Sequence, residues 1–299
     1  MRIALLLLAV AACRSDCDGY YAAAWSPDGR LLAIGTGQSL RLEDAVTRDL
    51  VHEYATRFTV HDVAFTADGR NLLYTGKGNT FSLVPVGADT PALAHPEVNP
   101  VVSFSAAVAR DGKTILSAAP NDEVLVWRDP FDKPARALKG AGKLWQFAIT
   151  PDGTRAVATS TSGHVTMWDV ATGKMLGRSK GHDGYIFALA MSPTGNHFAT
   201  GGSADDHIVR IWNIKKLGEA RHMIFGTVVR TLAFSPDGKT LAVGGNRKVV
   251  TLYDVKTGRV RGEINGLPAW PSALAFAPDG AKLLVTIAHG EALIYNCPA

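Results

Sequence analysis

Residues 232–238 read Leu-Ala-Phe-Ser-Pro-Asp-Gly, and this pattern returns in recognisable form seven times along the 299-residue chain. Its last four residues predict a tight turn, because Pro presets φ, Asp can hydrogen-bond its own backbone and Gly accepts positive φ. The turn glycines are Gly29, Gly69, Gly112, Gly153, Gly195, Gly238 and Gly280. Their successive spacings of 40 to 43 residues match the period of four short strands per repeat.

The residues before each turn predict a half-buried strand. An alanine stands three residues before each turn proline or its equivalent, and a large apolar residue stands two before it. This alternation has the period of two that strands require. We expect the alanines to face a narrow central channel. The alanines are Ala24, Ala64, Ala107, Ala148, Ala190, Ala233 and Ala275. The sequence therefore predicts an all-β, seven-bladed β-propeller over residues 20–299.

Family-like dipeptides follow in the later repeats. Trp168-Asp169 ends one expected strand, and Gly181-His182 precedes the next repeat. With these pairs the chain resembles the WD40-repeat family. The resemblance is strongest in repeats four to six, whereas Leu42-Glu43 and Leu83-Val84 stand where Trp-Asp would be in the first two. It implies a propeller that serves as a platform for protein partners.

The resemblance also implies a buried hydrogen-bonded tetrad inside the fifth blade. The matching positions are His182, Thr200, Asp206 and Trp212, with one inserted residue allowed near Ala204. His, a hydroxyl and Asp together are also the residue types of a catalytic triad. We interpret the set as structural, because a satisfied buried network accounts for all four residues.

The first residues predict a targeting segment. A positive charge at Arg2 precedes an apolar run over 3–10, which is too short to span a bilayer. We interpret residues 1–12 as a lipoprotein-type signal peptide and Cys13, in Val-Ala-Ala-Cys, as the lipidated residue, with 13–19 as a tether. A simple cleaved signal peptide with an ordinary Cys13 stays open. Arg14, rather than Asp, after the cysteine resembles the bacterial signal for outer-membrane lipoproteins facing the periplasm or the cell surface.

Closure of the ring raises two further expectations. The last repeat ends soon after the strand at 292–295, so we expect its outer fourth strand to be missing, with residues 13–18 as a weak cover. Cys17 and Cys297 remain as an even pair in an oxidising compartment. A disulfide between them stays open, because they could lie at opposite ends of the last blade and a disulfide needs Cα atoms within about 7 Å.

Motifs for cofactor chemistry are missing from the sequence. The nine histidines are isolated, without the spacing of a zinc site, and no cofactor or metal is predicted. Residues 169–174 resemble part of a quinoprotein docking motif, but Gly177 replaces the tryptophan that would complete it. The net charge of +4 comes from scattered Lys and Arg. We therefore expect no nucleic-acid binding, contact with a membrane only through the lipid, and a monomer.

A candidate binding ring stands six residues before each turn proline, near the mouth of the expected channel. Aromatic residues and Arg are enriched in interface hot spots. Strand parity would instead turn these side chains into the inter-blade core, but Arg230, His61 and Ser272 suit a core badly, which suggests a local bulge. Both interpretations stay open. The ring consists of Tyr21, His61, Phe104, Trp145, Phe187, Arg230 and Ser272.

Two functions from different classes remain. The first is a non-enzymatic, lipid-anchored envelope protein whose propeller binds an unidentified protein partner. The alternative is a propeller hydrolase or lactonase with a metal ion in the central channel. Such a site needs several convergent acidic or His residues, and the expected channel strands offer His61 and Asp62 in one blade.

Overall fold

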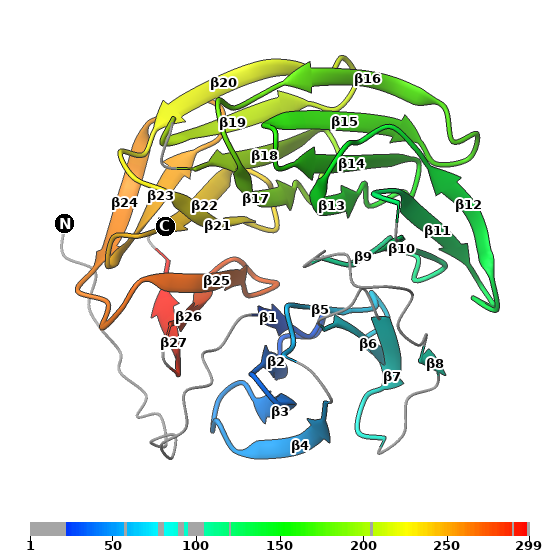
Figure 1. Cartoon of the computed structure of the whole chain (residues 1–299). Helices are drawn as coiled ribbons and strands as arrows, with labels where there is room; N and C mark the ends of the chain where they lie inside the picture. Colours follow the sequence, from blue (N-terminus) through cyan, green and yellow to red (C-terminus); the bar gives the residue numbers. More distant parts are fainter. Residues whose placement is uncertain are drawn as a thin grey trace.

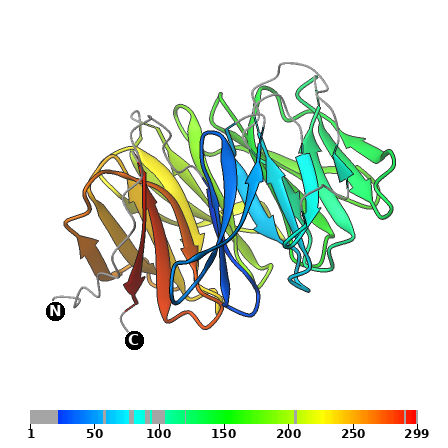
Figure 2. The ribbon, with the colours of Figure 1, turned by 90° about the horizontal axis from the view of Figure 1, so that it is seen from below.

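The chain folds into seven antiparallel sheets arranged as blades around a central axis (Figure 1). The computed structural model describes residues 22–56, 59–76, 81–88, 93–94, 105–119, 121–203, 206–288 and 290–297. Within these ranges the chain consists of strands and turns, without a helix that could cross a membrane. The predicted seven-bladed β-propeller is confirmed, and Figure 2 shows the blades side by side from below.

The first four blades each contain four strands. Blade 1 comprises β1 (Ala22–Trp25), β2 (Leu31–Gly35), β3 (Ser39–Asp44) and β4 (Leu50–Ala55). Blade 2 comprises β5 (Asp62–Phe65), β6 (Asn71–Thr75), β7 (Phe81–Pro85) and β8 (Leu93–Ala94). Blade 3 comprises β9 (Ala107–Val108), β10 (Thr114–Ala118), β11 (Val124–Arg128) and β12 (Pro134–Leu138). Blade 4 comprises β13 (Leu144–Ile149), β14 (Arg155–Ser160), β15 (His164–Asp169) and β16 (Met175–Lys180).

The last three blades continue the same order from the axis outward. Blade 5 comprises β17 (Ile186–Met191), β18 (His197–Gly202), β19 (Ile208–Asn213) and β20 (Gly218–Ile224). Blade 6 comprises β21 (Val229–Phe234), β22 (Thr240–Gly245), β23 (Val249–Asp254) and β24 (Val260–Asn265). Blade 7 comprises β25 (Pro271–Phe276), β26 (Lys282–Ile287) and β27 (Glu291–Asn296).

The seven predicted turns adopt one geometry. All seven turn glycines have φ between +69° and +73°, a region that side chains with a Cβ rarely enter. In blade 6 the Gly238 amide donates to the Ser235 carbonyl at 2.8 Å, and the Ser235 hydroxyl donates to Asp237 Oδ1 at 2.6 Å. This hydroxyl contact lowers the pKa of the Asp237 carboxyl. The turn tetrapeptide therefore stabilises its own conformation through local hydrogen bonds.

The core lies between neighbouring blades. Val209 and Ile211 of blade 5 pack in one buried cluster with Leu241 and Val243 of blade 6. Fully burying such a side chain stabilises the fold by about 1.5–3 kcal/mol. Each blade therefore depends on its neighbours, as expected for a ring of repeats.

The ring closes between blade 7 and blade 1 through side-chain contacts to the backbone. Trp25 Nε1 donates to the Ala275 carbonyl at 3.0 Å, and Arg48 Nη1 donates to the Ala292 carbonyl at 3.0 Å. In the described part of the chain the blade 7 sheet has three strands, as expected. The suggested cover by residues 13–18 lies outside the described residues and stays a prediction.

Candidate functional site

The candidate ring residues sit at β-bulges in four blades. The strand register skips Trp145 in β13, Phe187 in β17, Arg230 in β21 and Ser272 in β25. A bulged residue is unpaired in the ladder, and it breaks the alternation of faces. The bulge expected from the sequence is confirmed in these blades. It turns these positions off the core face, and none of the four belongs to a buried core cluster in the described residues.

Three aromatic rings contact one another across blades 4 and 5. Trp145 makes edge contacts with Tyr185 and Phe187, at centroid distances of 6.3 and 5.6 Å. Tyr185 and Phe187 stack at 5.9 Å with an interplanar angle of 12°. The Tyr185 side chain remains 47% exposed, and Trp145 and Phe187 are half-buried. The cluster is therefore internally packed and still open to solvent.

Arg230 of blade 6 extends the aromatic cluster toward blade 7. Its guanidinium carbon lies 4.9 Å from the Trp270 ring centroid and 5.8 Å from that of Phe187. Arg230 Nε donates to Asn246 Oδ1 at 2.6 Å, which fixes the side chain. Cation–π contacts of this kind contribute about 0.5–1 kcal/mol at exposed sites. We call Trp145, Tyr185, Phe187, Arg230 and Trp270 the mouth surface.

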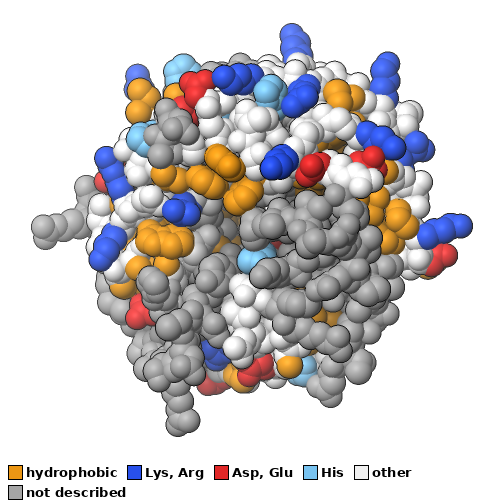
Figure 3. Space-filling model, viewed as in Figure 1, with side chains coloured by type: hydrophobic (Ala, Val, Ile, Leu, Met, Phe, Trp, Pro, Cys, Tyr) orange, Lys and Arg blue, Asp and Glu red, His pale blue; other side chains and the backbone are white. Residues whose placement is uncertain are grey.

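The structure brings part of the predicted ring together. His61 and Ser272 line the central channel, and the Ser272 hydroxyl lies 3.0 Å from that of Thr286. Tyr21 and Phe104 lie outside the described residues. Figure 3, drawn from the same direction as Figure 1, shows hydrophobic side chains gathered beside the centre of this face, with basic side chains among them. The aromatic and cation–π contacts of the mouth surface therefore lie on blades 4 to 7.

Tyr185 and Trp270 were missed in the sequence. Each stands two residues before a ring position, in the loop that leads into the innermost strand. Two aromatics at the same repeat position were a usable signal. Residues two apart share a face in a strand, but Tyr185 and Trp270 lie in the loops just before β17 and β25, where strand parity does not apply.

A cavity of about 350 Å³ occupies the central channel. Residues five before each turn proline line it in all seven blades: Ala22, Asp62, Ser105, Gln146, Ala188, Thr231 and Ala273. Of the alanines three before the proline, which were expected to face the channel, Ala64, Ala107 and Ala148 also line this cavity. Ala24, Ala190, Ala233 and Ala275 pack against the inter-blade core clusters. The small side chain serves blade packing at these positions.

Asp62 contributes a carboxyl group to this channel. Burial raises its pKa to about 7, against the lowering effect of hydrogen bonds from the Ala106 and Val63 amides and the Ser105 hydroxyl. Among the described residues, no group of three or more His, Cys, Asp or Glu side chains is placed to hold a metal ion.

The four tetrad residues of blade 5 are joined by a chain of hydrogen bonds. Trp212 Nε1 donates to Thr200 Oγ1 at 2.8 Å, and Thr200 Oγ1 lies 2.8 Å from His182 Nε2. His182 Nδ1 lies 2.8 Å from Asp206 Oδ2. The His182 side chain is fully buried, and the Asp206 side chain is 5% exposed. This arrangement is remote from solvent, as a structural network requires.

Two further contacts complete the network. Arg210 Nη1 donates to Asp206 Oδ2 at 2.8 Å, so the buried carboxylate has a permanent cation beside it. A Cβ on Gly202 would collide with the Asp206 carboxylate and the His182 ring, so the network requires glycine there. Gly202 was not singled out in the sequence, because its φ is ordinary and only the three-dimensional contact reveals the constraint.

The cysteine predictions fall mainly outside the described residues. Cys13 and Cys17 lie there, so lipidation and the disulfide stay predictions. Cys297 follows β27 and carries a free thiol in the described structure. Burial raises its pKa to about 11, which keeps the thiol protonated at neutral pH.

Comparison with known proteins gives the repeats a family. Residues 173–213 and 220–254 match the WD domain, G-beta repeat. The first range covers β16 of blade 4 to β19 of blade 5, and the second covers most of β20 of blade 5 and continues to β23 of blade 6, within the repeats where the sequence resemblance was strongest. Together they cover a minor part of the chain. The remaining blades are identified as propeller blades by their strand order.

Several eukaryotic proteins are similar to this chain. The WD repeat-containing protein 26 homolog of Arabidopsis thaliana is 29% identical over 65% of the chain. The U3 small nucleolar RNA-associated protein 15 homolog of Gallus gallus is 24% identical over 79%, and Autophagy-related protein 16 of Arabidopsis thaliana is 21% identical over 58%. The alignments span only 34% to 45% of these relatives' own lengths.

Proposed function

We propose that this chain, a seven-bladed propeller containing WD40 repeats, is a non-enzymatic scaffold that binds a protein partner at its mouth surface. The observation that carries the proposal is the set of bulges that turn half-buried Trp145 and Phe187 and exposed Arg230 off the core face beside the channel. Aromatic and Arg side chains supply most hot spots in protein interfaces. Rings that already pack on one another lose little conformational freedom on binding.

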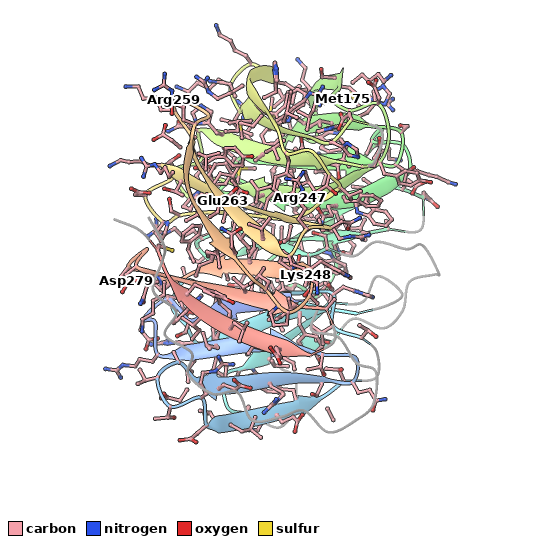
Figure 4. The ribbon with its side chains drawn as sticks, turned by 90° about the vertical axis from the view of Figure 1, so that its left-hand side faces the viewer. Met175, Arg247, Lys248, Arg259, Glu263 and Asp279 are labelled. Carbon is pink, nitrogen blue, oxygen red and sulfur yellow. The ribbon has the colours of Figure 1, made fainter. Side chains whose placement is uncertain are left out.

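The charges around the mouth surface favour an acidic partner. Arg247 and Lys248, both exposed, follow Asn246 in the loop between β22 and β23. Figure 4 shows them at one end of the blade, opposite the end where Asp279 lies. Arg230 points its guanidinium toward the same face, over Trp270. We therefore expect the partner to present apolar side chains beside Asp or Glu.

The test is partner capture with variants of the mouth surface. Phe187→Ala and Arg230→Gln should each reduce recovery of cross-linked partners at least tenfold, while the melting temperature stays within a few degrees of wild type. Val260→Ala, on the exposed outer strand of blade 6, is the matched control and should recover partners normally. Equal recovery by Phe187→Ala and wild type would overturn the proposal. A large loss of stability in Phe187→Ala would show that this ring is core.

We further propose that the propeller is anchored in the bacterial cell envelope by a lipid on Cys13, as an outer-membrane lipoprotein. Support comes from the sequence of residues 1–13, with its basic start, apolar run and small residues before the cysteine. Cys13→Ser should abolish incorporation of labelled fatty acid and release the protein from the membrane fraction. Cys297→Ser is the matched cysteine control. Persistent labelling of the Cys13→Ser variant would refute the anchor.

A further inference from the structure

Three neighbouring blades place polar side chains on one side of the central channel, whereas three of the other four blades place alanine there and blade 6 places Thr231. At the position five residues before the turn, blades 2, 3 and 4 contribute Asp62, Ser105 and Gln146 in succession. Blades 1 and 7 contribute Ala22 and Ala273 at the same level. A repeat that needed only close packing here would accept alanine throughout. The polar arc therefore calls for an explanation beyond the fold.

The Asp62 carboxylate is poorly supplied with donors. Oδ1 accepts the Val63 amide at 2.9 Å, but Oδ2 has only the Ser105 hydroxyl and the Ala106 amide, both at 3.4 Å. Ser105 Oγ also donates to the Phe147 carbonyl at 3.0 Å, so Asp62 shares the single hydroxyl proton with a nearer acceptor. Among the described residues no Lys or Arg forms an ion pair with Asp62.

A second acceptor in the same arc has no donor. Gln146 Oε1 is buried, and the described residues offer it no hydrogen-bond partner. Leaving such an acceptor unsatisfied costs about 1–3 kcal/mol. Each unsatisfied buried group in a folded protein asks for an unseen partner. Asp62 of blade 2 and Gln146 of blade 4 thus both lack a hydrogen-bond donor that a group inside the channel would supply.

We propose that the channel binds a primary ammonium group, which donates to the Asp62 carboxylate and to Gln146 Oε1 while its carbon chain lies against Ala22 and Ala273. An ammonium offers three donors and one compact positive charge, which suits one carboxylate and one amide oxygen. The volume of about 350 Å³ admits a short carbon chain. This site lies within the channel and uses none of the mouth-surface residues.

Binding by ionised Asp62 makes the affinity depend on pH. The other ionisable side chains that line the cavity, among the described residues, are His61 beside Asp62 and Arg230 at the mouth. Arg230 is held over Trp270 and by Asn246, so its charge lies toward the rim. Since the carboxyl has a pKa of about 7 in the free protein, protonation competes with the ammonium below that pH. Affinity should fall about tenfold from pH 8 to pH 6.

Calorimetric titration of the full chain with n-butylammonium chloride tests the site. We expect saturable binding at pH 8, at least tenfold tighter than that of n-butanol, the neutral analogue of similar size. Asp62→Asn should abolish it, and Gln146→Leu should weaken it. Thr231→Val, at the same repeat position in blade 6, should bind as wild type does. Nα-acetyl-lysine N-methylamide distinguishes two sources of the ammonium group. Binding tighter than that of n-butylammonium indicates a lysine side chain of a partner protein, and weaker binding indicates a free amine.

Two results would overturn the site. One is the absence of saturable heat from either amine up to about 10 mM, because a dissociation constant above that concentration is too weak for a functional site. The other is equal binding by wild type and a folded Asp62→Asn. If Asp62→Asn does not fold, the wild type decides: at pH 6, binding must release protons, seen as a dependence of the heat on the buffer's ionisation enthalpy. Binding without that release refutes the role of Asp62. Loss of partner capture in Phe187→Ala would leave these results unchanged.

Discussion

Blades 5 and 2 each carry a carboxyl group away from bulk solvent, and they treat it in opposite ways. In blade 5, Asp206 contacts both Arg210 and His182 at 2.8 Å. In blade 2, Asp62 faces the channel and accepts one amide hydrogen bond at 2.9 Å and two longer ones at 3.4 Å, from a hydroxyl and an amide. A buried charge is stable only when it is paired and hydrogen-bonded. The first carboxyl is therefore committed to the fold, whereas the second is available to a ligand.

The hydroxyl groups of the two blades differ in the same way. Thr200 Oγ1 bridges Trp212 and His182. Thr75 Oγ1, on the strand paired with Asp62, is buried and has no partner among the described residues. Blade 5 is a completed network and blade 2 an incomplete one. Incomplete networks are a weak point of a fold unless something binds there.

The largest expected effect comes from breaking the completed network. His182→Leu removes the ring that links Asp206 to Thr200 and leaves a buried carboxylate with fewer donors. We expect the free energy of unfolding to fall by about 3 kcal/mol, measured by urea denaturation. His164→Leu, at the partly exposed start of β15 in blade 4, is the matched control and should change stability little. Similar losses for the two variants would mean that the blade 5 network does not stabilise the fold.

We expect the ionised Asp62 carboxyl to destabilise the fold, whereas the blade 5 network stabilises it. Its folded pKa of about 7 exceeds the ordinary 3.8, so the wild type loses stability as pH rises from about 4 to about 7, where only the unfolded chain ionises freely. Asp62→Asn should therefore be more stable than wild type above pH 7, by about 2 kcal/mol after allowing for partial solvent access. The gain should shrink toward pH 4. Urea denaturation at several pH values measures it.

The Asp237 carboxyl, in a turn, is the control for the direction of the stability change in Asp62→Asn. The pKa of Asp237 is lowered by the Ser235 hydroxyl, so its contribution is present above the unfolded pKa and is lost as pH falls. Asp237→Asn should then reduce stability at neutral pH. If both Asn variants shifted stability in the same direction, the environment assigned to Asp62 would be wrong.

The smallest effect sharpens the comparison of the hydroxyls. Thr200→Val removes two hydrogen-bond partners at nearly constant volume and should cost about 1–2 kcal/mol. Thr75→Val removes an unpartnered hydroxyl and should change stability by less than about 0.5 kcal/mol, or raise it. Thermal unfolding of the two variants gives the difference. A larger loss for Thr75→Val would show that its hydroxyl has a partner.

The sequence predicted the structure best where a residue type has a single physical role. The turn glycines need positive φ, and all seven have it. It predicted less about single blades: the resemblance was strongest in repeats four to six, yet Trp127 Nε1 in blade 3 donates to Ser117 Oγ at 2.8 Å, the same tryptophan–hydroxyl contact as in blade 5. Without a neighbouring His and Asp, nothing in the sequence distinguishes this tryptophan–serine pair.

The seven-fold order follows from the sequence, because turn chemistry and strand alternation are local and recur with a constant period. The assignment of single side chains to core, mouth or channel was decided by the tertiary structure. One extra residue in β13, β17, β21 and β25 reverses the face of the ring positions, and convergence of all seven innermost strands sets which column meets at the axis. The contrast between a paired Asp206 and a poorly paired Asp62 depends on neighbours distant in sequence, and periodicity carries no record of them.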